Sequence, residues 1–572
     1  MDCRSLVTLT VVSISSLMAA TVGSANLIDA VEKGDKATVR SLLADKATEV
    51  NALRADGSSA LEWAVDRDDV EMVDLLLGAK ADVKITNRYG VVPLSKAAEN
   101  GNAAILERLL NAGADPNFVP PSGETALMAA ARNGKAVAVK TLLVHGANVK
   151  AVDSRGQTPI MWAAARDNAD AIRMLVEFGG DVNVKTNHPA PDNVPKLLEA
   201  AKQGKIKEPE VFGVFGSPPP TGFTAFLFAV RAGSMSAAKA LLEAGANVND
   251  SLSDGETALM VACFNAHWQL ADFLLDKGAN PNLATAGWNA LHQTIQTRRH
   301  NLTGGPPSPI PTGNEDSIEV VKKMIARGVD VNARMTKNGI KDGQRNRLNR
   351  LGATAFLLAA KGGDIEAMRV LLAAGANPKT PNVDGTTPLM VAAGLKIWNP
   401  GEDGGSLTSQ EGEVLEAVKL CVEQGNDVNG TNSDLETPLH GAAYRGVNTV
   451  VQYLVDKGAK LDAKDIRGYT PLLIANGLNY SSFYKQQPAT ADLLRQLMKG
   501  RGLSTEGQVA IGTECLDCFV THVSEIVAVF ERDQRMEAEY SAEPSLTTAM
   551  PSSISLEPGM QPAAASPLPS SR

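Results

Sequence analysis

The chain has little of what usually builds a catalytic or metal centre. It contains five cysteines and seven histidines in 572 residues, and aromatic residues make up only 4% of it. None of the histidines forms an evident cluster with cysteines or carboxylates at metal-ligand spacing. Phosphate-binding loops and the GxSxG, HExxH and GxGxxG patterns are also missing from the sequence. We therefore expect no metal, no cofactor and no enzymatic activity.

Positive charge is in deficit as well. The formal net charge is −9 and the isoelectric point is near 5.5. A negative chain is repelled by phosphate backbones and anionic headgroups. We expect no general binding to nucleic acid or to anionic membranes.

The N-terminal segment resembles a secretory signal. Arg4 gives a weak positive start, residues 6–18 are mainly apolar, and Gly23-Ser24-Ala25 resembles a cleavage site. An uncleaved membrane anchor is the alternative, but the run is short and contains several Ser and Thr residues. We expect residues 1–25 to be removed and the chain to be exported, periplasmic or secreted, monomeric and without a membrane span.

One pattern recurs along most of the chain. It opens with Gly, continues through Thr-Pro-Leu or Thr-Ala-Leu to Ala-Ala and Leu-Leu, and closes near Gly-Ala-Asn. The opening residues of the first clear copies are 33 positions apart, at Gly57, Gly90, Gly123 and Gly156. Later copies keep the spacing, although Leu435 stands 33 positions before Gly468 where a glycine is expected. A fixed period of this length indicates a solenoid of stacked repeats, which presents a long surface.

Each copy predicts a turn followed by two antiparallel helices. In residues 122–149, Gly123 provides the positive φ of the turn, Thr125 caps the first helix and Gly146 ends the second. Sister copies place Pro at the first helical position, where a missing N–H costs little. On the second helix we expect four apolar side chains to face inward: Val137, Val139, Leu142 and Leu143.

One copy has a complete family motif, Thr437-Pro438-Leu439-His440-Gly441-Ala442, and others match it in part. The repeat therefore resembles the ankyrin repeat. The resemblance covers residues 26–500 and about twelve units, the first of them a degenerate cap. It implies an all-α solenoid with hairpin-like tips. It also implies a non-catalytic scaffold that binds protein partners on its concave surface.

Five insertions interrupt the period. They lie near residues 188–220, 301–316, 335–350, 397–410 and 479–488. The first is itself about one period long and is either a decayed repeat or a loop. Insertions in repeat proteins often mark one functional face, although long surface loops are also tolerated at small entropic cost.

The resemblance places the partner-binding surface on the turn tips and on the exposed side of the first helices. Four residues form a candidate basic strip: Arg132, Arg155, Arg166 and Arg231. Four aromatic residues are candidates as well, the first three as a strip: Phe223, Phe264, Trp288 and Tyr444. For each, packing against a neighbouring insertion is the alternative. Three further aromatic residues are expected to lie in the core: Trp63, Trp162 and Phe228. Two histidines, His292 and His440, are expected to form structural hydrogen bonds between turns.

A pair of cysteines follows the last repeat, in residues 501–536. Cys515 and Cys518 match the first four positions of the c-type haem motif Cys-x-x-Cys-His, but Phe519 stands where the histidine belongs. A local disulfide is the favoured interpretation, and a redox or electron-transfer accessory protein is the alternative function. Cys263 and Cys421 fall on apolar helical positions and are expected to be buried. Residues 537–572 are rich in Ser, Pro and Ala and are expected to be a disordered tail.

Overall fold

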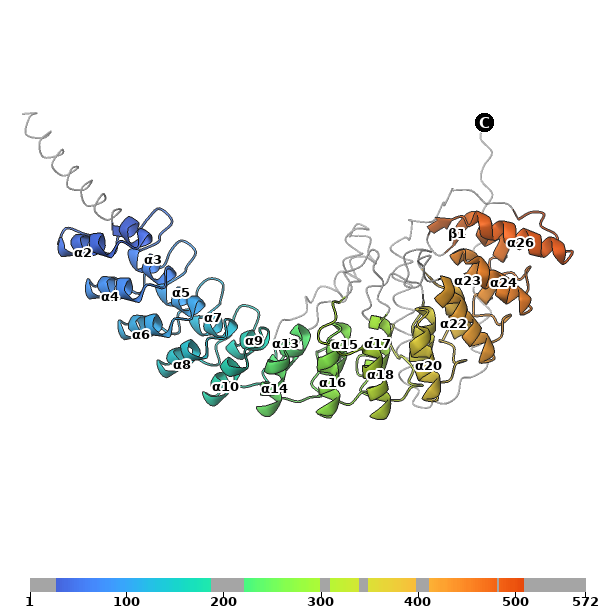
Figure 1. Cartoon of the computed structure of the whole chain (residues 1–572), viewed down its shortest axis with the longest axis horizontal. Coiled ribbons are helices and arrows are strands. Elements are labelled where there is room, and N and C mark those ends of the chain that lie inside the picture. The colour runs from blue at the N-terminus through green and yellow to red at the C-terminus, as the bar shows by residue number, and fades with distance from the viewer. Residues whose placement is uncertain are drawn as a thin grey trace, which may run out of the picture.

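Stacked helix pairs form one curved solenoid. The computed structural model describes residues 27–186, 221–298, 309–338, 348–397, 411–480 and 483–508. Within these ranges twelve helix pairs follow one another, the first helix of each lining the inner side of the curve and the second the outer side (Figure 1). The predicted all-α solenoid is confirmed, with one short hairpin added between the last two helices, β1 (Leu478–Tyr480) and β2 (Phe483–Lys485).

We number the pairs as units 1 to 12. The first helices are residues 27–33, α3 (Ala60–Asp66), α5 (Pro93–Asn100), α7 (Ala126–Arg132), α9 (Pro159–Ala164), α13 (Ala225–Ala232), α15 (Ala258–Phe264), α17 (Ala290–Arg298), α19 (Ala355–Lys361), α21 (Pro388–Ala393), α23 (Pro438–Arg445) and α25 (Pro471–Gly477). The second helices are α2 (Lys36–Ala44), α4 (Val70–Gly78), α6 (Ala103–Asn111), α8 (Ala136–Val144), α10 (Ala169–Glu177), α14 (Met235–Glu243), α16 (Trp268–Asp276), α18 (Ser317–Ala326), α20 (Ile365–Ala373), α22 (Glu411–Glu423), α24 (Asn448–Asp456) and α26 (Pro488–Gly500).

Threonine caps begin many of the first helices, as the repeat pattern predicts. The Thr125 hydroxyl accepts a hydrogen bond from the Met128 N–H at 3.3 Å, and the same bond recurs in other units. Behind each cap lies a pair of small residues, such as Ala163 and Ala164, that is fully buried. Small side chains allow helices of adjacent units to approach closely, so alanine replaces aromatic bulk in this core.

The second helices bury one face only. In α8, Val139 and Leu142 are fully buried and Leu143 nearly so, but Val137 is 69% exposed. The inward prediction is therefore wrong for Val137. Residues two apart lie about 200° apart around a helix, so Val137 points away from the face that Val139 buries.

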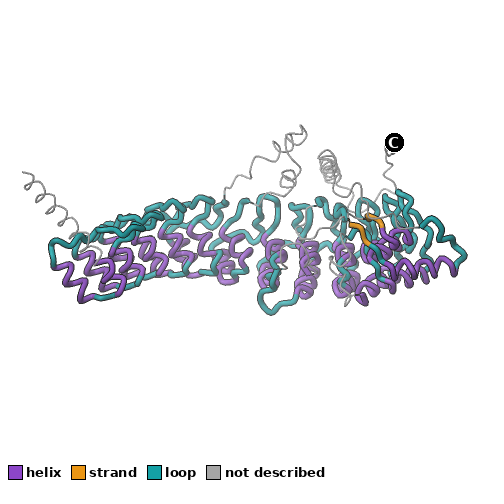
Figure 2. The backbone as a smooth tube through the Cα atoms, turned by 90° about the horizontal axis from the view of Figure 1, so that it is seen from above, coloured by secondary structure: helices purple, strands orange, loops and turns teal. Residues whose placement is uncertain are grey.

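Asparagine side chains join the loops of successive units. The Asn117 side chain donates to the Gly146 carbonyl at 2.9 Å and accepts from the Asn148 N–H at 2.7 Å. The same pair of bonds recurs from three more asparagines: Asn282, Asn332 and Asn429. These loops lie along one edge of the stack (Figure 2). Each unit is thus tied to the next by backbone-directed bonds as well as by its core.

At two insertions the residues on either side are joined by the same pair of backbone hydrogen bonds, which we call a closure. The Thr186 N–H donates to the Phe223 carbonyl at 2.9 Å, and the Gly222 N–H donates back to the Thr186 carbonyl at 3.2 Å. Met335 makes the equivalent pair of bonds with Ala353 and Gly352. Units 5 and 6 pack directly on each other across the first closure. Units 5 and 6 are therefore neighbours in the stack, and the choice between a decayed repeat and a loop for residues 188–220 falls outside the described residues.

Both motif histidines bond between turns, as predicted. His440 is fully buried; its Nδ1 accepts from the Thr437 N–H at 3.0 Å and its Nε2 donates to the Tyr469 carbonyl. His292 bonds the Ala333 carbonyl in the same way, and burial lowers its pKa to about 4. Cys263 and Cys421 are buried as expected, which raises the pKa of each thiol to about 12. The interpretations of residues 1–25, of Cys515 and Cys518, and of residues 537–572 fall outside the described residues.

Candidate functional site

Three aromatic side chains recur at one position on the inner helices. Trp63, Trp162 and Phe228 each precede the buried small pair of a first helix, in α3, α9 and α13. All three are half-buried, and Trp63 and Phe228 pack against the core. Their assignment to the core is therefore wrong in part, because this position of the helix faces the concave side. Their shared repeat position is visible in the sequence, but it is interpreted there as a core position.

In unit 5 two arginines converge on the ring of Trp162. Arg132, the last residue of α7, and Arg155, in the turn before α9, each place the guanidinium carbon 5.4 Å from the ring centroid. The indole Nε1 is buried and has no hydrogen-bond partner. A guanidinium cannot accept a hydrogen bond, so neither arginine can satisfy the indole N–H. We call these three residues the unit 5 cluster.

Two carboxylates neighbour the cluster, and each lies within ion-pair distance of one of its arginines. Glu124 pairs with Arg132 at 3.0 Å, and its partial burial raises its pKa. The Asp153 side chain accepts the N–H groups of Arg155 and Gln157 at 2.8 Å each, and it lies 3.5 Å from the Arg155 guanidinium. The Arg155 side chain nevertheless stays 57% exposed, so its donors remain accessible from the concave side.

Unit 2 contains the same arrangement of arginine over tryptophan, but there both side chains have partners. Arg54 lies over the Trp63 ring at 5.2 Å, but it is held by Asp29 at 2.5 Å and Glu32 at 2.6 Å. The Trp63 Nε1 donates to the Ser58 hydroxyl at 3.0 Å. In unit 5 the residue at the position of Ser58 is Gln157, which does not reach the Trp162 indole. The indole N–H at this repeat position has a hydrogen-bond partner in unit 2 and none in unit 5.

The four candidate arginines do not form one continuous strip in the structure. Arg132 and Arg155 meet at Trp162, whereas Arg231 lies over the Phe223 ring at 5.4 Å in unit 6. Arg166 is exposed, and its side chain has no ion pair or hydrogen bond with the described residues. The predicted strip is therefore one cluster in unit 5 with two further exposed arginines beside it.

The predicted aromatic strip is not an exposed surface. Phe223 is 7% exposed because it packs on Phe228 with ring centroids 5.1 Å apart. Trp288 is 5% exposed, in a tip whose Gly287 carbonyl accepts from the Thr336 N–H. Tyr444 is 2% exposed, near the end of α23 where Gln487 of unit 12 bonds its carbonyl. Phe264 is half-buried and is the member that retains partial exposure.

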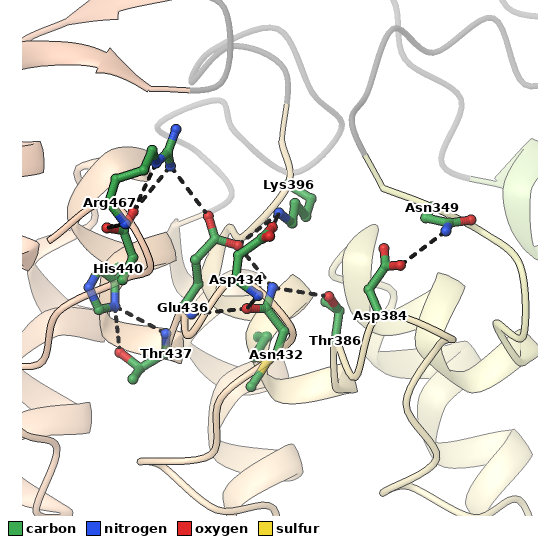
Figure 3. A network of polar contacts seen from close by, with 12 residues as sticks. Asn349, Asp384, Thr386, Lys396, Asn432, Asp434, Glu436, Thr437, His440 and Arg467 are labelled. Atoms are coloured by element: carbon green, nitrogen blue, oxygen red, sulfur yellow. Dashed lines mark hydrogen bonds and ion pairs between the residues drawn. The ribbon is translucent and has the colours of Figure 1, made fainter. Parts of the chain in front are cut away.

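The tips of units 10 to 12 hold a polar network (Figure 3). The buried Glu436 carboxylate receives Lys396 at 2.8 Å, Asn432 at 2.9 Å and, more distantly, Arg467 at 3.9 Å. Lys396 also pairs with Asp434 at 2.6 Å, and despite its burial these carboxylates raise the pKa of its ammonium. These charges compensate one another, so the network fixes the tips of three units to each other.

Among the described residues no group of three or more His, Cys, Asp or Glu side chains is arranged to hold a metal ion. No described helix combines the length and the apolar character needed to cross a bilayer. The unit 5 cluster is the candidate site because its buried, unpartnered indole N–H lies beside two arginines, one of them exposed.

Comparison with known proteins covers most of the chain. A family model described as ankyrin repeats (3 copies) matches residues 27–118, 94–186, 197–285, 226–302, 312–397 and 407–485. Mitochondrial disaggregase of Bos taurus is 27% identical over 213 residues, which is 37% of this chain and 27% of that protein. The Homo sapiens disaggregase is 31% identical over 183 residues, which is 31% of this chain and 25% of that protein.

A third relative is a Caenorhabditis elegans homologue of transient receptor potential cation channel subfamily A member 1. It is 32% identical over 125 residues, 22% of this chain and 9% of that protein. The similarity to these three relatives therefore spans less than a third of each of them. The repeated matches of the family model, together with the twelve stacked helix pairs, show that the chain belongs to the ankyrin-repeat family.

Proposed function

We propose that the chain is a non-catalytic scaffold that binds an acidic segment of a protein partner on its concave surface, at the unit 5 cluster. Ankyrin repeats support protein–protein interaction in general. The observation that carries the finer proposal is the buried, unpartnered indole N–H of Trp162 between two guanidinium groups.

The cluster offers hydrogen-bond donors and no free acceptor. A carboxylate has two acceptor oxygens and matches the planar fork of an arginine, while its second oxygen can take the indole N–H. Arginine and tryptophan are also the residue types that contribute most energy at protein interfaces. Arg166 and Arg231, exposed on units 5 and 6, extend the positive character along the concave side. The complementary partner is a segment with several Asp or Glu residues.

A labelled acidic peptide tests the proposal directly. We expect the full chain to bind fluorescein-labelled (Glu-Gly)6 in a fluorescence anisotropy titration, and not the matching (Lys-Gly)6. Trp162→Phe removes the indole N–H and keeps an aromatic ring at this position. It should weaken binding about tenfold or more, because a hydrogen bond to a charged group contributes about 1.5–3 kcal/mol. Arg155→Gln should weaken binding to a similar extent.

Trp63→Phe is the matched control, because the Trp63 indole is already satisfied by Ser58. Its affinity for the peptide should equal that of the unmodified chain. The proposal is wrong if the acidic peptide does not bind, or if Trp162→Phe and Trp63→Phe bind it equally well.

We also propose that the chain is exported. The support is the order of residues in the N-terminal segment, where a short apolar run and Gly23-Ser24-Ala25 precede the first helix at residue 27. Intact-mass measurement of the chain isolated from its native cells should give a product that begins at Asn26. A product that retains residues 1–25 would contradict export by cleavage.

A further inference from the structure

The outer layer of the solenoid has a groove at the seam between units 6 and 7. At this seam α14 of unit 6 and α16 of unit 7 lie further apart than most neighbouring second helices do (Figure 1). The inner helices of the same units, α13 and α15, remain in close contact. The seam holds a groove of about 610 Å³ lined by Lys239, Leu242, Glu243, Ala246, Asn247, Val248, Phe273 and Lys277. Its volume lies within the range of small-molecule sites, about 300–1,000 Å³.

Ion pairs join other outer seams. Arg108 of α6 binds Asp74 of α4 at 2.5 Å, and Lys323 of α18 binds Asp272 of α16, also at 2.5 Å. Across the α14–α16 seam the described residues form no such pair. The groove instead contains two lysines, Lys239 from α14 and Lys277 from the end of α16. Charges of one sign across a seam repel each other, so these two lysines do not hold the helices together.

The carboxylates near the groove are engaged elsewhere. Glu243 of α14 lies 3.9 Å from Arg173 of the preceding unit. Asp276 of α16 pairs with Lys323 at 2.8 Å and with Arg327 at 2.9 Å, both from the following unit, and these cations lower its pKa. Neither Lys239 nor Lys277 has an ion-pair partner among the described residues.

An aromatic ring lies between the two lysines. Phe273 is half-buried and lines the groove, and the Nζ atoms of Lys239 and Lys277 are each 5.5 Å from its ring centroid. An ammonium held against an aromatic face keeps its charge available to an anion. The groove therefore combines a half-buried aromatic ring with two lysines that have no ion-pair partner among the described residues, and Glu243 also lines it.

We propose that this groove binds a small molecule with an aromatic body and an anionic group. The aromatic body would stack on Phe273, and the anionic group would take the ammonium groups of Lys239 and Lys277. By neutralising the like charges, the ligand would also draw α14 and α16 together. The groove lies on the outer face of units 6 and 7, so the inference is independent of the proposed partner site on the concave face.

The probe is 8-anilinonaphthalene-1-sulfonate, titrated against the full chain and followed by fluorescence. Lys239→Glu removes one positive charge and places an acid opposite Lys277. This variant should bind the probe at least about tenfold more weakly, as expected for loss of one charged contact. Its thermal midpoint should rise, because the seam gains an attractive pair. The gain in stability separates lost binding from lost folding.

Lys140→Glu is the matched control. Lys140 occupies the same position of α8 that Lys239 occupies in α14, but it does not line the groove. Its affinity for the probe should be unchanged. Phe273→Leu, which keeps an apolar side chain and removes the ring, should weaken binding, and uncharged 1-naphthalenemethanol should bind poorly.

Three outcomes would overturn the proposal. The first is the absence of saturable probe binding by the unmodified chain. The second is equal affinity in the Lys239→Glu and Lys140→Glu variants. The third is equal binding of 1-naphthalenemethanol and the sulfonate, which would show a purely apolar groove.

Discussion

At the scale of single residues, the repeat depends on a left-handed backbone position at the start of each unit. Gly57, Gly123 and Gly468 adopt φ values of 82°, 80° and 82° there. Leu435 takes the same place in unit 11 with φ 58°, although a side chain makes this conformation unfavourable. The surrounding fold imposes the conformation, so Leu435 is a point of stored strain.

Replacing this leucine should stabilise the protein. Leu435 is 48% exposed, so Leu435→Gly removes little packing and relieves the strained φ. We expect a gain of roughly 0.5–1 kcal/mol after the greater flexibility of glycine in the unfolded chain is included. Urea unfolding followed by circular dichroism measures the change.

Gly468→Ala is the reverse substitution, which adds a side chain at the same position of unit 12. A Cβ at Gly468 would meet no atom within 4 Å, so the substitution tests backbone conformation alone. It should lower the free energy of unfolding by about 1 kcal/mol. A destabilised Leu435→Gly variant would show that the leucine side chain contributes packing that outweighs the strain.

At the scale of helices, the end of α17 is held by one buried arginine. The Arg298 side chain is 9% exposed and binds Asp364 at 2.7 Å and Glu366 at 2.9 Å, both at the start of α20. It also donates to the Ser317 hydroxyl at the start of α18. Arg298 therefore connects three helices of units 8 and 9 at the point where an insertion separates α17 from α18.

Removing this arginine should be costly. Arg298→Ala would leave the Asp364 carboxylate, whose side chain is 1% exposed, without its cation. Breaking one partner of a buried pair typically costs about 3–5 kcal/mol. Arg173→Ala is the control, because Arg173 and its partner Asp170 are 55% and 80% exposed, and it should change stability by less than about 1 kcal/mol. Equal urea midpoints for the two variants would contradict the assignment.

Local rules explain which elements could be predicted from the sequence. A threonine cap, a proline at the first helical position and a closing glycine act within a few residues, so the helix pairs follow from their spacing. The burial of Trp162 depends instead on how its helix is oriented against the next unit. Its indole N–H has no partner because Gln157 occupies the position at which Ser58 accepts the hydrogen bond in unit 2. The α14–α16 groove likewise depends on charges from two units, which no single repeat reveals.

At the scale of the whole molecule, stability is a sum over neighbouring units. Each unit contacts only the units beside it, so a surface site in one region has little effect on the rest. The unit 5 cluster lies on the concave side, and the α14–α16 groove lies on the outer side of the next two units. The two proposed sites can therefore be altered separately, provided that the contacts between units 5 and 6 remain intact.

Those contacts lead to a prediction about the first insertion. Thr186 and Phe223 are already joined by backbone hydrogen bonds, α9 packs on α13, and the Asp167 carboxylate accepts the Ala237 N–H at 2.7 Å. Deletion of residues 188–220 should therefore leave the thermal midpoint within a few degrees of the full chain. Shortening a closed loop gives only a small entropic gain, about 0.6 kcal/mol per halving. A large fall in the midpoint would show that the deleted residues stabilise the stack. Unchanged stability with weaker binding of (Glu-Gly)6 would instead place them in partner recognition beside the unit 5 cluster.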